Sequence, residues 1–149
     1  MKKIGIFIVL ILLSLFLISF NKYEYTNGDD DYSFEHITDE AIISGGKCME
    51  VGATEVTLNG ITTRTAKSAN GVRVLETLDG NKTYKINLKV NAIRGNVKVV
   101  LVCEEKIVYE FKINEDNSYI YHLGGSSITS LKIACESLEY EIIYSIKEL

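Results

Sequence analysis

Two histidines, His36 and His122, are the side chains whose ordinary pKa lies closest to neutral pH. Acid–base catalysis or metal binding needs further polar groups arranged around such a ring. His122 follows Tyr121 in an apolar–polar alternation with only Tyr and Ser near it, and His36 ends an acidic segment. The sequence therefore predicts two surface histidines, no catalytic residue and no metal site.

Three cysteines, Cys48, Cys103 and Cys135, offer thiol chemistry. They form no C-x-x-C pair and no cluster with histidine, so neither zinc binding nor a redox motif is indicated. The alternation places Cys103 and Cys135 on inward faces of their strands. A disulfide between them would stabilise the fold by about 2–4 kcal/mol, and two reduced thiols that pack as small apolar groups are the alternative.

Other short motifs lack the surroundings that their chemistry needs. The run GGSS at 124–127 has no nucleophile-elbow framework, and GGKC at 45–48 lacks the remaining residues of a phosphate-binding loop. Three aspartates at 29–31 do not have the alternate spacing of a calcium loop. We therefore expect no cofactor and a protein that is not an enzyme.

The elements that carry these residues are predicted to be β-strands. Beyond residue 36, apolar and polar residues alternate with a period of two, which is typical of strands with one buried face. The clearest runs are residues 84–91, 97–103, 107–113, 119–123, 128–135 and 138–146, and weaker ones are residues 40–44, 54–59, 61–66 and 72–77.

Turn signals divide these runs at short intervals, as at Arg94-Gly95-Asn96, and Glu104-Glu105 predicts a tight hairpin. The pattern predicts an all-β fold, an antiparallel two-sheet sandwich, jelly-roll-like, of about 8–9 strands. A closed barrel is the alternative. From about residue 37 to 146 the pattern resembles, in a general way, the jelly-roll sandwiches of carbohydrate-binding modules, and that likeness covers no specific motif.

Five aliphatic side chains interrupt the outward faces of these strands. They mark either an interaction surface or a second strand face that a loop covers. We favour the second interpretation, in which these residues are structural. These residues are Val100, Val102, Val108, Ile120 and Ile143.

The first twenty residues predict export. Lys2 and Lys3 precede an uncharged stretch from Ile4 to Phe20, which is apolar on every side of a helix. No good cleavage site for signal peptidase follows it, so a retained single-pass anchor with the C-terminal domain outside is favoured. Secretion after cleavage is the alternative. Residues 21–36 are predicted to be an acidic tether and residues 37–149 one extracytoplasmic domain.

The balance of charged residues limits the classes of partner that the protein can bind. The chain carries 16 basic and 20 acidic side chains, a net charge of −4, and this balance argues against nucleic acid. We therefore expect a non-catalytic extracytoplasmic protein, tethered to the membrane from Ile4 to Phe20, that binds an unknown ligand at the cell surface or in the envelope, either a glycan or an envelope protein. A glycan-binding module that uses exposed Tyr or Phe and a structural subunit of an envelope assembly are the alternatives.

Overall fold

A computed structural model describes residues 37–125 and 127–149. The expected apolar anchor at 1–20, the tether at 21–36 and His36 lie outside these residues. None of the helices in the described part of the chain is long and apolar enough to cross a membrane.

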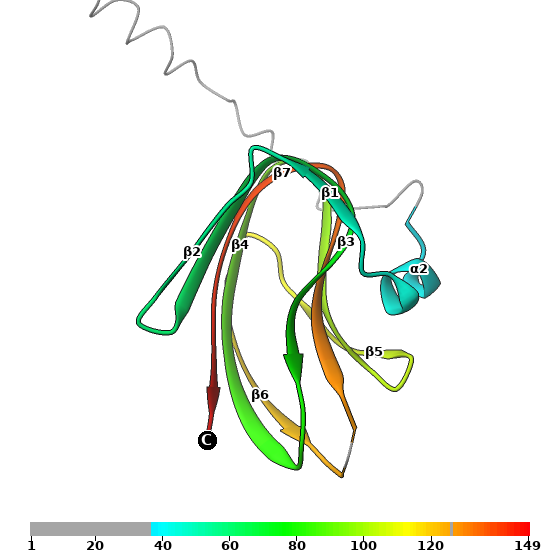
Figure 1. The fold of residues 1–149 in the computed structure, drawn as a ribbon, viewed down its shortest axis with the longest axis vertical. Coiled ribbons are helices and arrows are strands. Elements are labelled where there is room, and N and C mark those ends of the chain that lie inside the picture. The colour runs from blue at the N-terminus through cyan, green and yellow to red at the C-terminus, as the bar shows by residue number, and fades with distance from the viewer. Residues whose placement is uncertain (1–36, 126) are drawn as a thin grey trace, which may run out of the picture. The chain divides into compact units, whose positions relative to one another are not determined.

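The described residues form one antiparallel sheet of seven strands and one short helix, in agreement with the predicted all-β class (Figure 1). Hydrogen bonding joins the strands in the order β1-β3-β7-β4-β5, with β2 also on β3 and β6 also on β4. The expected pair of jelly-roll-like sheets is thus replaced by a single sheet. In chain order the elements are α2 (Asp39–Ser44), β1 (Cys48–Val51), β2 (Thr54–Leu58), β3 (Ile61–Leu78), β4 (Lys82–Cys103), β5 (Lys106–Phe111), β6 (Asp116–Leu123) and β7 (Thr129–Glu148).

Three long strands, β3, β4 and β7, explain why fewer strands form than the sequence predicts. Each was expected as two separate strands, with a turn signal at Arg94-Gly95-Asn96 between the two in β4, yet each continues through a bulge. In β4 the pairing with β7 shifts register on either side of Arg94, and in β3 it shifts on either side of Ala69. A bulge keeps the strand in the sheet while bending it, so the Gly95 signal marks a bend and not a chain reversal.

The bends divide the sheet into two arms that face each other (Figure 1). The first arm contains β2, β6 and residues 61–66, 82–92 and 138–148 of the long strands. The second arm contains β1, β5 and residues 69–78, 94–103 and 129–136. The inner faces of both arms contribute to one apolar core, whose largest fully buried side chains include Tyr140, Phe111, Ile86, Leu101 and Ile133.

Aromatic side chains join the two arms along the edge formed by β5 and β6. The Tyr109 ring of β5 stacks on Tyr119 of β6, with ring centroids 3.8 Å apart, and Phe111 meets Tyr109 edge-on at 4.9 Å. Offset stacking and edge-on contacts are the favoured arrangements of such rings. Every Tyr and Phe of the described residues is buried or half-buried.

The hairpin between β4 and β5 forms where Glu104-Glu105 predicts it. Both residues adopt positive φ, 47° and 58°, as a tight two-residue hairpin turn requires. One register shift follows, between Leu101 and Val102, so Ile107 opposes Val102 while Tyr109 opposes Leu101. Ile107 therefore packs on the outer face of the sheet, although the alternation had placed it inward with Tyr109.

Residues 40–44, expected as a strand, are part of helix α2. The Thr38 hydroxyl accepts a hydrogen bond from the Ala41 amide at 3.2 Å, and Asp39 and Glu40 occupy the first turn. Both features stabilise a helix N-terminus. The helix covers the outer face of the second arm, where Ile42 packs with Val72, Val100, Val102 and Ala134.

Lys132 of β7 holds the C-terminal end of this helix. Its ammonium group donates to the carbonyls of Ile42, Ile43 and Gly45 at 3.1, 2.6 and 2.8 Å. Lys132 is 6 % exposed, and burial lowers the pKa of its side chain. These three bonds satisfy carbonyls that a helix end leaves without intrahelical partners.

We expect the substitution Lys132→Met to loosen α2 while the sheet remains folded. The three carbonyls lose their buried donor, which should reduce the free energy of unfolding by about 1–3 kcal/mol. Amide hydrogen exchange should accelerate in residues 39–45 more than in β4 or β7. Lys85→Met, at an exposed lysine, is the control, and equal exchange in the two variants would contradict the role given to Lys132.

Candidate functional site

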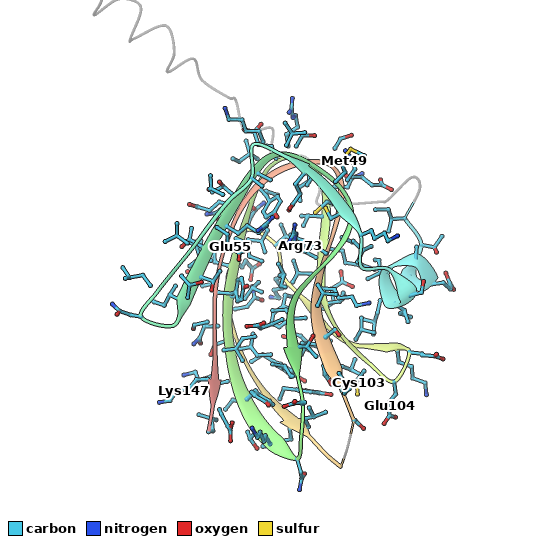
Figure 2. All side chains as sticks on the ribbon, viewed as in Figure 1. Met49, Glu55, Arg73, Cys103, Glu104 and Lys147 are labelled. Carbon is cyan, nitrogen blue, oxygen red and sulfur yellow. The ribbon has the colours of Figure 1, made fainter. Side chains whose placement is uncertain are left out.

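A cluster of charged side chains lies on the inner face of the sheet, at the edge opposite the aromatic rings. Glu50 comes from β1, Glu55 from β2, Arg64 and Arg73 from β3, and Tyr140 from β7. Glu50 points inward because it shares a strand face with Cys48, which packs against the core. Figure 2 labels Glu55 and Arg73, which lie between the two arms.

The Glu50 carboxylate is the centre of this cluster. It accepts a hydrogen bond from Tyr140 Oη at 2.7 Å, from Arg73 Nη2 at 2.6 Å and from Arg64 Nε at 3.2 Å. Arg64 Nη2 also contacts Glu50 Oε2, and Arg64 Nη1 donates to Glu55 at 2.6 Å. The Glu50 and Arg64 side chains are only 4 % and 8 % exposed. The cluster therefore links four strands through buried, charge-assisted hydrogen bonds.

These contacts fix the protonation of the cluster. Burial alone would raise the pKa of Glu50, but the hydrogen bonds from Arg64 and Tyr140 and the arginine charges lower it below its ordinary value. Burial, with Glu50 as acceptor, raises the pKa of Tyr140. Burial would lower the pKa of Arg64, but the bonds to Glu50 and Glu55 raise it. All of these shifts move titration away from neutral pH, which favours an ionised Glu50, a charged Arg64 and a protonated Tyr140 hydroxyl there.

Two cysteines lie beside the charged cluster, and their placement corrects the predicted disulfide. All three cysteines are free thiols. Cys103 pairs with Thr129 of β7, whereas Cys135 lies six positions further along that strand, opposite Val97. Six residues of strand span about 20 Å, and a disulfide requires Cα atoms about 4.4–6.8 Å apart. The pairing of Cys103 with Cys135 is therefore wrong.

The partner that the structure gives Cys135 is Cys48. The two thiols lie close enough to affect each other's titration, and their contact is the main cause of a lowered pKa at Cys48 and a raised pKa at Cys135. Burial raises the pKa of Cys135 further. Cys48 is half-buried and Cys135 is buried.

His122 lies far from this cluster in the sheet, on β6. Its Nδ1 is 2.9 Å from the Thr83 hydroxyl, and its ring lines a surface hollow with Lys82 and Glu148. Lys82 and Glu148 form an ion pair of 2.9 Å across this hollow. Within the described residues, no three His, Cys, Asp or Glu side chains are arranged to hold a metal ion.

The five outward aliphatic residues do not form one surface. Val100 and Val102 are buried under α2, a helix where the sequence suggested a covering loop. Val108 is exposed next to the bulge of β5, Ile120 is exposed on β6, and Ile143 is half-buried on β7.

A different set of aliphatic side chains is exposed together. Strands β1 and β2 follow one another along the same side of β3, opposite residues 68–71 and 61–65, and have no further strand beside them. We call residues 48–51 and 54–58 the β1–β2 edge. Its outward side chains are Met49, Val51, Thr54, Val56 and Leu58, none of them charged.

The exposure of this edge is large. Met49 is 76 % exposed, Leu58 is 70 % exposed, and Ile61 at the start of β3 opposes Leu58 and is also exposed. Natural proteins usually protect a free strand edge with charged side chains, as Glu110 and Asp116 do on β5 and β6. The β1–β2 edge lacks such protection on its outward face.

Sequence reasoning missed both the charged cluster and this edge. Glu50 and Arg64 belong to strands whose alternation is weak, and charged residues there suggest a solvent-facing side. The available signal was the C-x-E spacing of Cys48 and Glu50, which places both side chains on one face of a strand.

The fold and this site define an all-β protein built on one bent antiparallel sheet, with a buried charged cluster and an unprotected apolar edge. No protein-family model and no curated protein matches the chain.

Proposed function

We propose that this protein is a non-catalytic binding protein of the outer side of a membrane, and that it binds an envelope protein through the β1–β2 edge. The observation that supports binding is the unprotected row of exposed aliphatic side chains on this edge, from Met49 to Leu58. The apolar stretch from Ile4 to Phe20, preceded by Lys2 and Lys3, supports the location and the tethering.

The chemistry of the edge favours a protein partner. A free strand edge offers backbone donors and acceptors to an added strand, and alternate apolar side chains give that contact its specificity. Val56 and Leu58 are two residues apart and lie on the same face, so both would touch the added segment. A glycan-binding module would use exposed aromatic rings, and the described Tyr and Phe are turned into the core.

The fully bonded Glu50 carboxylate supports a non-catalytic protein. A general acid or base needs a proton that it can release near neutral pH, and the contacts of Arg64 and Tyr140 shift the titration of Glu50 away from that range. The cluster is better suited to hold β1 and β2 in place behind the edge.

The test is a pull-down of envelope fractions with the full-length chain in detergent. We expect the double variant Val56→Thr, Leu58→Thr to reduce retention at least about tenfold, because burial of each aliphatic side chain contributes about 1.5–3 kcal/mol. Threonine keeps the β-branched preference for strands. Recovery of the bound material should depend on protease treatment and not on added soluble glycan.

The matched control carries the same change at two exposed aliphatic residues elsewhere, Val108→Thr and Ile120→Thr. Retention should be unchanged in this variant. Loss of retention here but not in the edge variant would contradict the edge and favour the surface that includes Val108 and Ile120. Competition by soluble glycan would favour a glycan-binding module.

The same free edge gives one observation in favour of a structural subunit, because two copies of the chain can add strands to each other. The solution mass across a dilution series separates the two functions. A constant monomer mass supports an envelope partner, and a dimer that dissociates on dilution and in the edge variant supports self-assembly.

A further inference from the structure

Cys48, Gly71 and Cys135 form a row across three adjacent strands. Gly71 of β3 pairs with Cys48 of β1 on one side and with Cys135 of β7 on the other. Both thiols belong to the inner face and pack in the same apolar core. Because glycine has no side chain, nothing on β3 separates the Cys48 and Cys135 side chains, and the contact between the two thiols shifts the pKa of each.

Gly71 is required in the middle of this row. Its φ is +107°, and a Cβ atom there would lie 2.4 Å from the Lys47 carbonyl oxygen and 3.3 Å from the Cys48 Cα. Backbone contacts this close cannot be relieved by rotating a side chain. The sheet is also bent here, since the pairing of β3 with β7 shifts register between Ala69 and Gly71.

The two thiols differ in access. Cys48 is half-buried on a strand at the edge of the sheet, where a small reagent can reach it, and Cys135 is fully buried. The contact with the Cys135 thiol and, to a smaller extent, the Arg73 charge lower the pKa of the Cys48 thiol, although burial and Glu50 act in the opposite sense. The thiolate is the reactive form of cysteine. Cys48 is therefore the first thiol to react, and Cys135 is the adjacent thiol that can complete an exchange.

We propose that Cys48 and Cys135 are a redox-active dithiol site that closes to an intramolecular disulfide by exchange with a low-molecular-weight disulfide. This inference concerns the inner face of the sheet and does not depend on the proposed binding function.

The exchange proceeds in two steps with a glutathione-type disulfide as oxidant. The Cys48 thiolate attacks one sulfur of that disulfide, so a Cys48–glutathione bond forms, the original disulfide breaks, and one glutathione leaves with the proton that Cys48 released. The Cys135 thiol then loses its proton and attacks Cys48 Sγ, which breaks the mixed bond and releases the second glutathione. Two protein thiols are oxidised, and one small disulfide is reduced to two thiols.

Closure of this bond requires β1 to move toward β7. Cα atoms two strands apart in a flat sheet are about 9–10 Å apart, twice the strand spacing, whereas disulfides span about 4.4–6.8 Å. β1 is short, pairs only with β3, and is already joined to β7 by the hydrogen bond from Tyr140 to Glu50, so a movement toward β7 keeps that contact. Its outward residues Met49 and Val51 move with it, so the redox state also changes one end of the β1–β2 edge.

The experiment treats the reduced full-length chain, folded in detergent, with oxidised glutathione. We expect the number of free thiols to fall from three to one, with a loss of about 2 Da from the intact mass and no retained glutathione. Proteolysis should yield a peptide that joins Cys48 to Cys135, and dithiothreitol should restore all three thiols. Cys103→Ser should form the same bond.

Three results would overturn the proposal. The first is that all three thiols stay free in the folded chain, although the same oxidant modifies them in denaturant. The second is a disulfide that includes Cys103. The third is a stable mixed disulfide between Cys48 and glutathione. The variant Cys135→Ser separates the two steps, because it should stop at that mixed disulfide. A Cys135→Ser chain that still forms an intramolecular bond would equally reject the assignment.

Discussion

Replacement of Glu50 by glutamine should lower the free energy of unfolding by about 3–5 kcal/mol at pH 7, because it leaves Arg64 buried without its main charge partner. The Arg64 side chain is 8 % exposed, and its remaining carboxylate partner in this variant is Glu55, whose side chain is 48 % exposed. The Arg73 and Tyr140 bonds to the carboxylate are weakened by the same change. Urea unfolding of the full-length chain, monitored by tyrosine fluorescence, measures the loss.

The pH dependence of this loss has a defined sign. The pKa of Glu50 is lowered in the folded chain, so its contribution to stability is complete above the ordinary glutamate value of about 4.3. It disappears as the pH falls through the lowered pKa. The stability difference between the natural chain and Glu50→Gln should therefore be constant from about pH 5.5 to 8 and shrink below about pH 4.

Glu110→Gln removes the same charge at an exposed site, where Glu110 pairs with Lys98 at 3.4 Å. This variant should lose little stability, since exposed ion pairs contribute little. A Glu50→Gln chain as stable as Glu110→Gln would show that the cluster does not hold the strands. A difference as large at pH 3 as at pH 7 would show that the Glu50 charge is not the cause.

Gly95→Ala is the second substitution with a large expected effect, because it places a Cβ atom inside the bend of the sheet. That atom would lie 2.4 Å from the Ser137 carbonyl oxygen and 2.5 Å from that of Glu136. Both contacts are with backbone of β7, which cannot move without breaking the bend. We expect a loss of about 4 kcal/mol or more, in the range of the most destabilising single substitutions.

Gly60→Ala provides a matched control for Gly95→Ala. Gly60 has a similar φ, +75° against +86° at Gly95, but a Cβ at Gly60 meets nothing within 4 Å. The control therefore carries only the cost of the left-handed backbone, about 1–2 kcal/mol. Thermal unfolding of both variants measures the difference, and equal losses would mean that the bend does not depend on the close approach of Gly95 to β7.

The sequence by itself determined the class of the fold. Period-two alternation from residue 84 to 91, and again from 138 to 146, requires one buried and one exposed strand face, and the side chains at Ile86, Leu88 and Ile142 are buried accordingly. The Glu104-Glu105 turn also followed from sequence, because a two-residue hairpin depends on local backbone geometry alone. Such features need no information about distant residues.

The number of strands was decided by tertiary structure. Gly95 signals a left-handed backbone, and this conformation serves a turn and a bulge equally well. β4 continues through Gly95 because β7 supplies pairing partners on both sides of it, Glu139 for Arg94 and Glu136 for Asn96. These partners lie about forty residues away in the chain, so local sequence cannot distinguish a bend from a chain reversal.

The site depended on tertiary structure even more strongly. From sequence alone, a glutamate or arginine on a strand is assigned to the solvent-exposed face, because burial of an unpaired charge is costly. Glu50 can be buried because Arg64 and Arg73 of β3 and Tyr140 of β7 donate hydrogen bonds to its carboxylate. Likewise Cys48 meets Cys135 only across Gly71, a contact that the register of three strands creates and that no local pattern encodes.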